Sequence, residues 1–161
     1  MSDAIDVIME QWRRERPDLD LSAMGPLGRL WQVSALLDPE VEQVLTRHGL
    51  RRGEFDVLTA LRRAGEPYTL IPSELAETLM MSRAGMTNRV DRLEEAGLVE
   101  RALDPADRRS FLVAMTEKGR AVIDETMTEH AENLKRLVAG LSRQELEALD
   151  LALRTLLRGL S

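Results

Sequence analysis

The spacing of apolar residues along the chain predicts a protein built mostly of helices. A short first helix is indicated by one apolar stripe, formed by Ile5, Ile8, Met9 and Trp12. Pro17 ends this helix, because proline lacks the N–H that a further turn needs. A long second helix is predicted over 22–48, with a kink or a restart at Asp38-Pro39. A third helix is predicted over 53–63.

The middle of the chain carries the sharpest pattern. Residues 73–80, SELAETLM, and residues 83–96 each predict a short helix, and the turn that joins them is tight. Such a pair is the helix-turn-helix arrangement. Two alternating segments follow, LVERAL and SFLVAM, and the turn residues DPADRR between them predict a β-hairpin. A hairpin that directly follows a helix-turn-helix is a wing, which we expect over about 98–115.

Two more helices are predicted at the carboxyl end. Thr116 caps a long one, and a capping box from Ser142 to Glu145 opens the last. The predicted fold is mainly α with a small β-hairpin wing, an α+β class, in the order α-α-α-α-α-β-β-α-α. We expect three parts: an extra helix and a dimerisation helix in 1–48, a winged helix-turn-helix in 49–116, and dimerisation helices in 117–161.

The terminal helices carry more apolar surface than one small chain needs. The last helix is nearly a ladder of leucines, and the stripe of the helix over 22–48 is too long to hide behind one wing domain. We therefore expect a homodimer. The alternative is that these helices pack on each other within one chain.

A helical wheel of residues 83–96 separates a buried face from a polar one. Met86, Val90 and Leu93 share the inward face. The outward face consists of Ala84, Asn88, Asp91, Arg92 and Glu95, with Thr87 at its edge. Small and hydrogen-bonding side chains of this kind fit the major groove, where Asn pairs with adenine and Arg with guanine. The alternative is an ordinary solvated helix face.

The wing adds a second candidate contact with double-stranded DNA. Arg108 and Arg109 occupy the hairpin tip, where arginine suits the negative potential of a minor groove. The alternative is a solubilising turn, in which Asp104 and Asp107 pair with these arginines. The candidate DNA-binding residues are Ser82, Arg83, Ala84, Thr87, Asn88, Arg92, Arg108 and Arg109.

Composition narrows the class of protein. The chain has 161 residues, 43% of them hydrophobic, and a net charge of −6, which argues against coating nucleic acid by bulk electrostatics. It contains no cysteine and two histidines, which we expect at an interface or in the core. No nucleophile motif, phosphate loop or metal-ligand spacing is present, so we expect neither an enzyme, a cofactor nor a metal. The sequence shows no membrane span or secretory signal, and we expect the cytoplasm.

The segment SELAETLMMSRAGMTNRVDRLEEAGLVER, followed by DPADRRSFLVAMTEKG, resembles the winged helix-turn-helix core of the MarR family. Asp107 and Arg109 match the D-x-R positions of the family's wing. The similarity spans essentially the whole chain. It implies a homodimer on a pseudo-palindromic operator, with recognition helices in successive major grooves and wings in the minor groove. On this basis Arg109 would enter the minor groove, and Asp107 would support the wing by holding Arg109 in place.

A narrower resemblance concerns sensing. The extra first helix, the ERPDLD link, GEFDVL and MTNRVDRL are similar to the urate-responsive branch of the family, the PecS and HucR type regulators. In that branch a tryptophan, an aspartate and two arginines act together. They match Trp12, Asp56, Arg89 and Arg101.

The residues themselves support this resemblance in part. On the wheel Arg89 points sideways toward the protein body, where its fork of donors suits an anionic ligand. The alternative is a structural ion pair with Asp56 or Glu95. Arg62 or Arg63 would also satisfy Asp56 without a ligand, and Trp12 on an apolar stripe is otherwise only an anchor.

Together these patterns predict a ligand-responsive DNA-binding transcriptional regulator, a repressor released from its operator by a small anion such as urate. An anionic purine would bind Arg89, disturb Asp56 and shift the recognition helix. Two alternatives stay open at this point. The effector is instead a phenolic or other lipophilic ligand, or the winged helix serves protein interaction without binding DNA.

Overall fold

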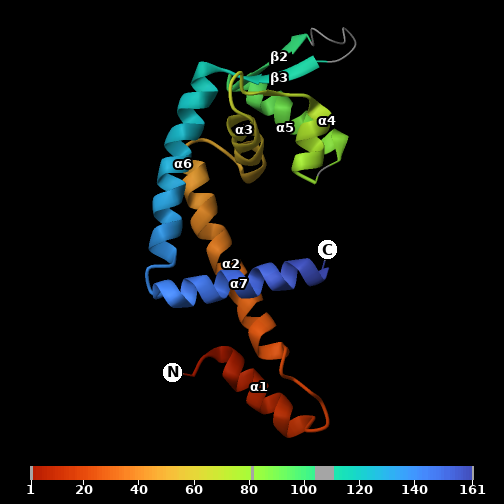
Figure 1. The fold of residues 1–161 in the computed structure, drawn as a ribbon, viewed down its shortest axis with the longest axis vertical. Coiled ribbons are helices and arrows are strands. Elements are labelled where there is room, and N and C mark those ends of the chain that lie inside the picture. Colours follow the sequence, from red (N-terminus) through yellow and green to blue (C-terminus); the bar gives the residue numbers. More distant parts are fainter. Residues whose placement is uncertain (1, 81, 104–110, 161) are drawn as a thin grey trace. The chain divides into compact units, whose positions relative to one another are not determined.

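The structure is a computed structural model that describes residues 2–80, 82–103 and 111–160, without the side chain of Arg83. The chain divides into two compact units, residues 1–41 and 42–161. Its elements are α1 (Ala4–Glu15), α2 (Met24–Arg47), α3 (Arg52–Ala64), β1 (Thr69–Leu70), α4 (Pro72–Thr78), α5 (Arg83–Glu95), β2 (Val99–Leu103), β3 (Phe111–Met115), α6 (Glu117–Leu137) and α7 (Arg143–Leu160) (Figure 1). The fold is therefore mainly helical with a small sheet, as predicted.

In the first unit, α1 is fixed to the start of α2 by one arginine. Asp3 and Asp6 form a capping box at the start of α1, with both bonds at 3.0 Å. Arg29 of α2 donates to Asp3 at 2.8 Å and to Asp6 at 2.5 Å. Of the predicted apolar stripe Met9 is buried, whereas Trp12 stays 44% exposed. The helix exists as predicted, but within its own unit it buries only part of its stripe.

The second helix runs without a break through Pro39. Of the predicted kink or restart at Asp38-Pro39, the restart is therefore wrong, and the kink stays a prediction. A proline removes one backbone donor from the helix, and the hydrogen bonds of the turns on either side suffice to continue it.

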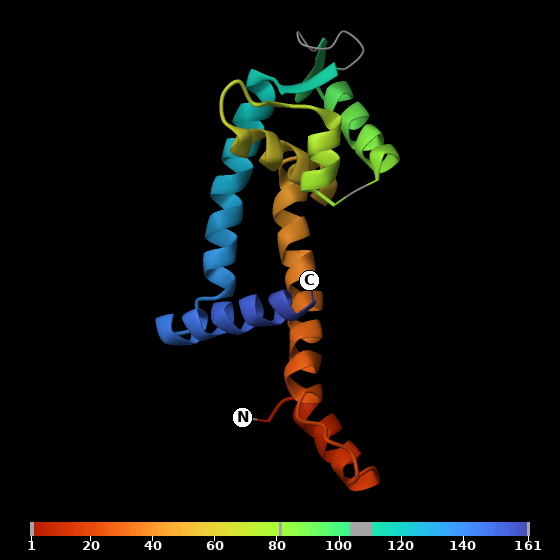
Figure 2. The same ribbon diagram turned by 45° about the vertical axis from the view of Figure 1, so that its right-hand side comes forward.

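In the second unit, α3, α4 and α5 lie close to the β2–β3 hairpin, as Figures 1 and 2 show from two directions. Large side chains from these elements are fully buried: Leu58, Leu61, Leu75, Met86, Leu93 and Val113. Their burial forms one core beneath the sheet. This core fixes the helix-turn-helix and the wing relative to each other.

The sheet has three strands, in the order β1-β3-β2, and both pairings are antiparallel. The predicted hairpin is confirmed, with Val99 opposite Met115 and Leu103 opposite Phe111. The strand β1 was not predicted. Its two residues are too few to show the alternation by which a strand is recognised in a sequence.

The helix-turn-helix also follows the prediction closely. The helix α4 ends at Thr78, two residues before the predicted end, and Met80 then takes a positive φ of 50°. The side chain of Ser82 caps α5 by accepting from the N–H of Gly85 at 3.2 Å. The helix α5 covers nearly the predicted range of 83–96.

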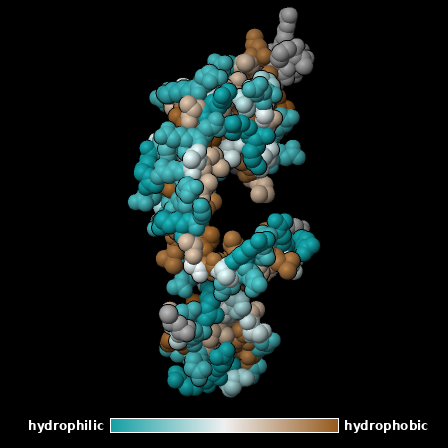
Figure 3. Space-filling view, turned by 60° about the vertical axis from the view of Figure 1, so that its left-hand side comes forward, coloured by the Kyte–Doolittle hydropathy of each residue, from teal (hydrophilic) through white to brown (hydrophobic). Residues whose placement is uncertain are grey.

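Both predicted caps at the carboxyl end are confirmed. Thr116 accepts from the N–H of Gly119 at 3.0 Å, and the N–H of Ser142 donates to Glu145 at 2.8 Å. The last helix, α7, buries none of its described residues. Its exposed leucines are Leu146, Leu149, Leu151, Leu156, Leu157 and Leu160. Figure 3 shows hydrophobic surface interspersed with hydrophilic residues.

None of the helices, as far as the structure describes them, combines the length and the apolar character needed to cross a membrane.

The start of α6 lies against the backbone that leads into β2. The N–H of Thr116 donates to the carbonyl oxygen of Leu98 at 3.1 Å. A Cβ atom placed on Gly119 would lie 2.0 Å from that same oxygen. Since a backbone carbonyl cannot move aside as a flexible side chain can, only glycine fits at this position.

We therefore predict that Gly119→Ala destabilises the protein by about 1–3 kcal/mol, the usual cost of overpacking a fitted site. Urea unfolding followed by circular dichroism measures this loss. Gly140→Ala is the matched control, because a Cβ atom there would meet nothing within 4 Å. Equal stabilities of the two variants would contradict the close approach of α6 to Leu98.

Candidate DNA interface and ligand site

The predicted faces of the recognition helix α5 are observed. Met86, Val90 and Leu93 are each 1% exposed and hold the helix against the core. The exposed residues of the opposite face are Ala84, Thr87, Asn88, Asp91, Arg92 and Glu95. Ser82, at the amino end, is exposed as well. The burial fixes which side chains α5 can present to DNA, and their contact with DNA stays a prediction.

Part of the predicted interface lies outside the described residues. Asp107, Arg108 and Arg109 fall in the segment 104–110, and the side chain of Arg83 is not described either. Their assignment to the wing and the DNA contact stays a prediction from the sequence.

Two carboxylates of α3 face arginines of α5. Nη1 of Arg89 lies 3.9 Å from Oδ2 of Asp56, and Nη1 of Arg92 lies 3.7 Å from Oε1 of Glu54. Both arginines come from the helix predicted to read DNA. The recognition helix is therefore linked to α3 by two ion pairs, one turn apart on α5.

Arg89 takes the sideways position that the wheel predicted. Its side chain is 31% exposed, and its Nη1 donates to the carbonyl oxygen of Gly53 at 3.4 Å. The absence of a side chain at Gly53 makes room for it, since a Cβ atom there would lie 2.4 Å from the guanidinium carbon. The guanidinium thus rests on the first turn of α3.

Asp56 is half-buried, and this burial raises its pKa above the ordinary value for an aspartate. The positive charges of Arg52 and Arg89 act in the opposite direction and lower the pKa. The sequence also allowed Arg62 and Arg63 as ion-pair partners of Asp56, but both arginines bind other groups. Arg62 donates to Asp124 at 2.7 Å, and Arg63 donates to the carbonyl oxygen of Thr59 at 3.3 Å.

Arg101, at the entry to the wing, makes a different set of contacts. Its guanidinium binds Asp91 and Glu94 of α5, and its backbone N–H donates to Glu94 at 3.1 Å. The hydrogen bond with Asp91 raises the pKa of Arg101 further above its ordinary value. Its guanidinium carbon also lies 5.2 Å from the centre of the Phe111 ring. Arg101 therefore ties β2 to the recognition helix.

The two histidines lie near these elements. His130 of α6 meets the ring of Phe55 edge-on, with 5.3 Å between ring centres, and burial lowers its pKa. Its Nδ1 is buried without a hydrogen-bond partner in the part of the chain that the structure describes. Nε2 of His48 lies 2.6 Å from Glu129, whose pKa is lowered by Arg47 and then by His48. Both histidines thus contact neighbouring side chains: His130 contacts Phe55, and His48 contacts Glu129.

Comparison with known proteins identifies the family. The model of the MarR family matches residues 48–110. The HTH-type transcriptional regulator PecS of Dickeya dadantii (strain 3937) is 41% identical over 138 residues, which cover 86% of this chain and 83% of PecS. The chain belongs to the MarR family.

Solved structures of MarR-family regulators share the fold. AbsC, a MarR family transcriptional regulator from Streptomyces coelicolor, matches with a TM-score of 0.78 and 26% identity, over 88% of this chain and 96% of AbsC. A mutant MarR from E. coli complexed with operator DNA matches with a TM-score of 0.72 and 28% identity, over 85% of this chain and 97% of that one. This MarR-family chain is accordingly a DNA-binding transcriptional regulator.

Of the four residues suggested by the narrower family resemblance, two lie against each other in this MarR-family chain. Asp56 and Arg89 form a pair, whereas Arg101 binds the acids of α5. Trp12 belongs to the first unit and the other three residues to the second, so its share in a ligand site stays a prediction.

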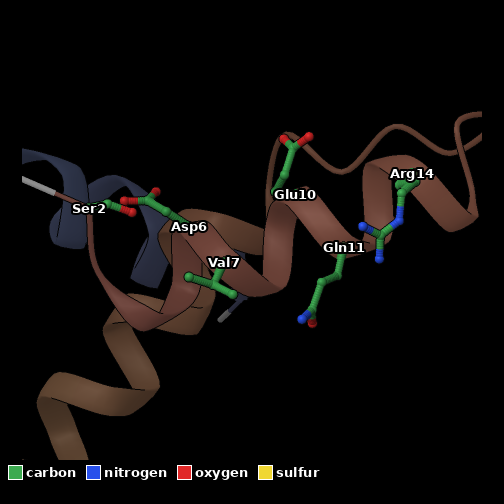
Figure 4. Close-up of a pocket in the computed structure, with 6 residues that line it drawn as sticks. All are labelled: Ser2, Asp6, Val7, Glu10, Gln11 and Arg14. Atoms are coloured by element: carbon green, nitrogen blue, oxygen red, sulfur yellow. The ribbon is translucent and has the colours of Figure 1, made fainter.

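An open groove runs along α1, and Figure 4 shows the side chains on that face of the helix. Its volume is about 410 Å³, and it is lined by Ser2, Asp6, Val7, Glu10, Gln11 and Arg14. Trp12 does not line it. Over the described residues, no group of three or more histidine, aspartate or glutamate side chains is arranged to hold a metal ion.

Sequence reasoning missed Glu54, Asp91 and Glu94 as partners of the arginines. Glu54 stands three residues after Arg51 at a helix start, which is the spacing of a capping box. That spacing predicts the hydrogen bond that one carboxylate oxygen of Glu54 accepts from the N–H of Arg51. The second oxygen faces a residue 38 positions later, which no local pattern indicates.

We predict that Arg89→Met raises the pKa of Asp56 further, because it removes one of the two cations that lower it. A pH titration of the Asp56 carboxyl carbon by NMR measures this change. Arg62→Met is the matched control and should leave Asp56 unchanged, since Arg62 is paired with Asp124. An unchanged Asp56 titration in Arg89→Met would contradict the pairing across α3 and α5.

Proposed function

We propose that this regulator is a homodimeric repressor that binds a pseudo-palindromic operator and is released from it by a small anion such as urate. The observation that carries this proposal is the pair between Arg89 of the recognition helix and Asp56 of α3. This pair supports the proposal because a guanidinium is a group that binds anions, and Arg89 lies on the helix proposed to read DNA.

The exposed face of α5 supports the DNA-binding half of the proposal. Thr87, Asn88 and Arg92 offer a methyl group, an amide and a guanidinium, which match features of thymine, adenine and guanine in the major groove. Arg108 and Arg109 would follow the backbone into the minor groove. The net charge of −6 requires that affinity come from such local contacts.

The effector half rests on competition for Arg89. An anion that accepts from the guanidinium would take the place of Asp56, or would repel its carboxylate. The exposed fractions of the two side chains, 31% and 38%, leave the pair partly accessible to solvent. Displacement of Asp56 would remove one of the ion pairs that join α3 to α5. Because DNA and anion would favour different positions of α5, each must weaken the other by the same factor.

The dimer is supported by the apolar surface of α7. Six leucines on this helix are between 37% and 78% exposed in the single chain. A helix with this many uncovered leucines is stabilised when a second copy covers it, and a twofold dimer would also match two half-sites of an operator.

For the dimer, we predict that Leu149→Glu combined with Leu156→Glu weakens self-association at least about tenfold, because two carboxylates would be buried against the partner. Sedimentation equilibrium measures the monomer–dimer constant. Gln144→Glu adds charge to the exposed first turn of α7 and serves as the control. A wild-type chain that stays monomeric at all concentrations would refute the dimer.

For the effector, we predict that saturating urate lowers the affinity of the wild-type protein for its operator by about 5- to 150-fold, the usual range of allosteric coupling. Arg89→Met should bind the same DNA while its response to urate falls to nearly none. Fluorescence anisotropy of a labelled duplex from the upstream region of its gene, at fixed salt, measures both.

Arg63→Met is the matched control, since the Arg63 side chain donates to the carbonyl oxygen of Thr59 and forms no ion pair with a described residue. Full urate response in Arg89→Met would refute the ligand site. Release by salicylate but not by urate would replace the purine with a phenolic anion. Failure to prefer any DNA sequence over another would refute the operator binding.

A further inference from the structure

The carboxylate of Glu54 is the least exposed charged group near the recognition helix. Its side chain is 11% exposed, and the residue as a whole is 8% exposed. It occupies the first turn of α3, where its Oε2 accepts from the N–H of Arg51 at 2.9 Å. This bond caps the helix and fixes the direction of the carboxyl group.

The second oxygen of that carboxyl group faces Arg92. Oε1 lies 3.7 Å from Nη1, which is within ion-pair distance and beyond a direct hydrogen bond. The two residues line the same pocket of about 330 Å³, between the start of α3 and the end of α5, together with Gly49, Leu50, Glu95 and Leu98. The carboxylate is therefore held by the backbone of α3, and the arginine is the more exposed partner.

The arginine keeps most of its donors for another contact. Its side chain is 50% exposed, and its Nη1 lies at ion-pair distance from Glu54. A guanidinium has five N–H donors in a rigid fork, so holding one corner leaves the others for a guanine edge. An arginine without such a hold has many rotamers and loses more entropy on binding.

We propose that Glu54 is a specificity-determining positioning residue, which orients Arg92 toward one base while contacting no DNA itself. This inference rests on the proposed role of α5 as the helix that reads the operator. Removal of the Glu54 charge should strengthen binding to every sequence by reducing repulsion of phosphates. It should also weaken the preference for the correct sequence, because Arg92 is no longer held.

The test is Glu54→Gln, which keeps the cap because glutamine also accepts from the N–H of Arg51. Two fluorescein-labelled duplexes are used: one enriched from a random-sequence library by the wild-type protein, and a scrambled duplex of equal composition. Anisotropy titrations at fixed salt give the ratio of the two affinities. We expect this ratio to fall about fivefold in Glu54→Gln, the effect of losing one ordered side chain.

Glu77→Gln is the matched control. Glu77 is an exposed residue of α4, outside the face of α5 that would read DNA, and no ion pair joins it to any residue that the structure describes. Its loss of charge should raise both affinities by similar factors and leave their ratio unchanged. Circular dichroism and thermal unfolding check that each variant is folded. Arg92→Lys, which keeps the charge but not the fork, provides a second test that leaves α3 untouched and should also lower the ratio.

A double-mutant comparison separates positioning from other effects. In an Arg92→Ala background, Glu54→Gln should no longer change the ratio. An equal fall in that background, or an unchanged or higher ratio in Glu54→Gln alone, would overturn the inference. A wild-type protein that shows no preference between the duplexes would instead overturn the proposed function.

Discussion

Burial of one side of the recognition helix is the constraint on which the rest of the site depends. Met86, Val90 and Leu93 repeat at helical spacing and are almost completely enclosed. Because these three side chains fix the rotation of α5 about its axis, they decide which residues face outward and which face sideways. The direction of Arg89, Asp91 and Arg92 follows from this burial rather than from any preference of those residues themselves.

Once its rotation is fixed, α5 is held from two sides by arginine–carboxylate pairs. On one side α3 supplies the acids Glu54 and Asp56 for Arg92 and Arg89. On the other side β2 supplies Arg101, which binds Asp91 and Glu94. Ion pairs at partly exposed positions each contribute only about 0–1 kcal/mol, so these contacts adjust α5 without locking it. A helix held in this way can respond to a charged ligand.

The elements of this fold could be predicted because their signals are local. Apolar spacing, Thr116 and the box from Ser142 to Glu145 act within a few residues, and the helices begin where these residues indicate. The strand β1 was missed because two residues carry no period, and α2 continues through Pro39 because a single lost bond does not end a long helix. Local patterns thus predict regular helices and strands well, but they miss very short strands and helices that continue through a proline.

In the candidate site, too, the features that depend on one element could be predicted, and those that depend on several elements could not. The wheel gave the direction of Arg89, since direction depends only on residues within α5. The partner of Arg92 comes from α3 and the partners of Arg101 come from α5, and they were missed because pairing depends on how separate elements pack. Asp56 and Arg89 were brought together by resemblance to a family, which carries the tertiary information that a single sequence lacks.

The two acids of α3 differ in a way that suits two different tasks. Glu54 is nearly enclosed and is fixed by a backbone hydrogen bond, so its charge is costly to move. Asp56 is 38% exposed, and burial already raises its pKa, so its charge is held less firmly. A difference of only about 1.4 kcal/mol changes an equilibrium tenfold, and an anion can supply that much by taking over one exposed guanidinium. The enclosed acid is therefore suited to hold a DNA-reading arginine in place, and the exposed one to give up its arginine when an anion binds.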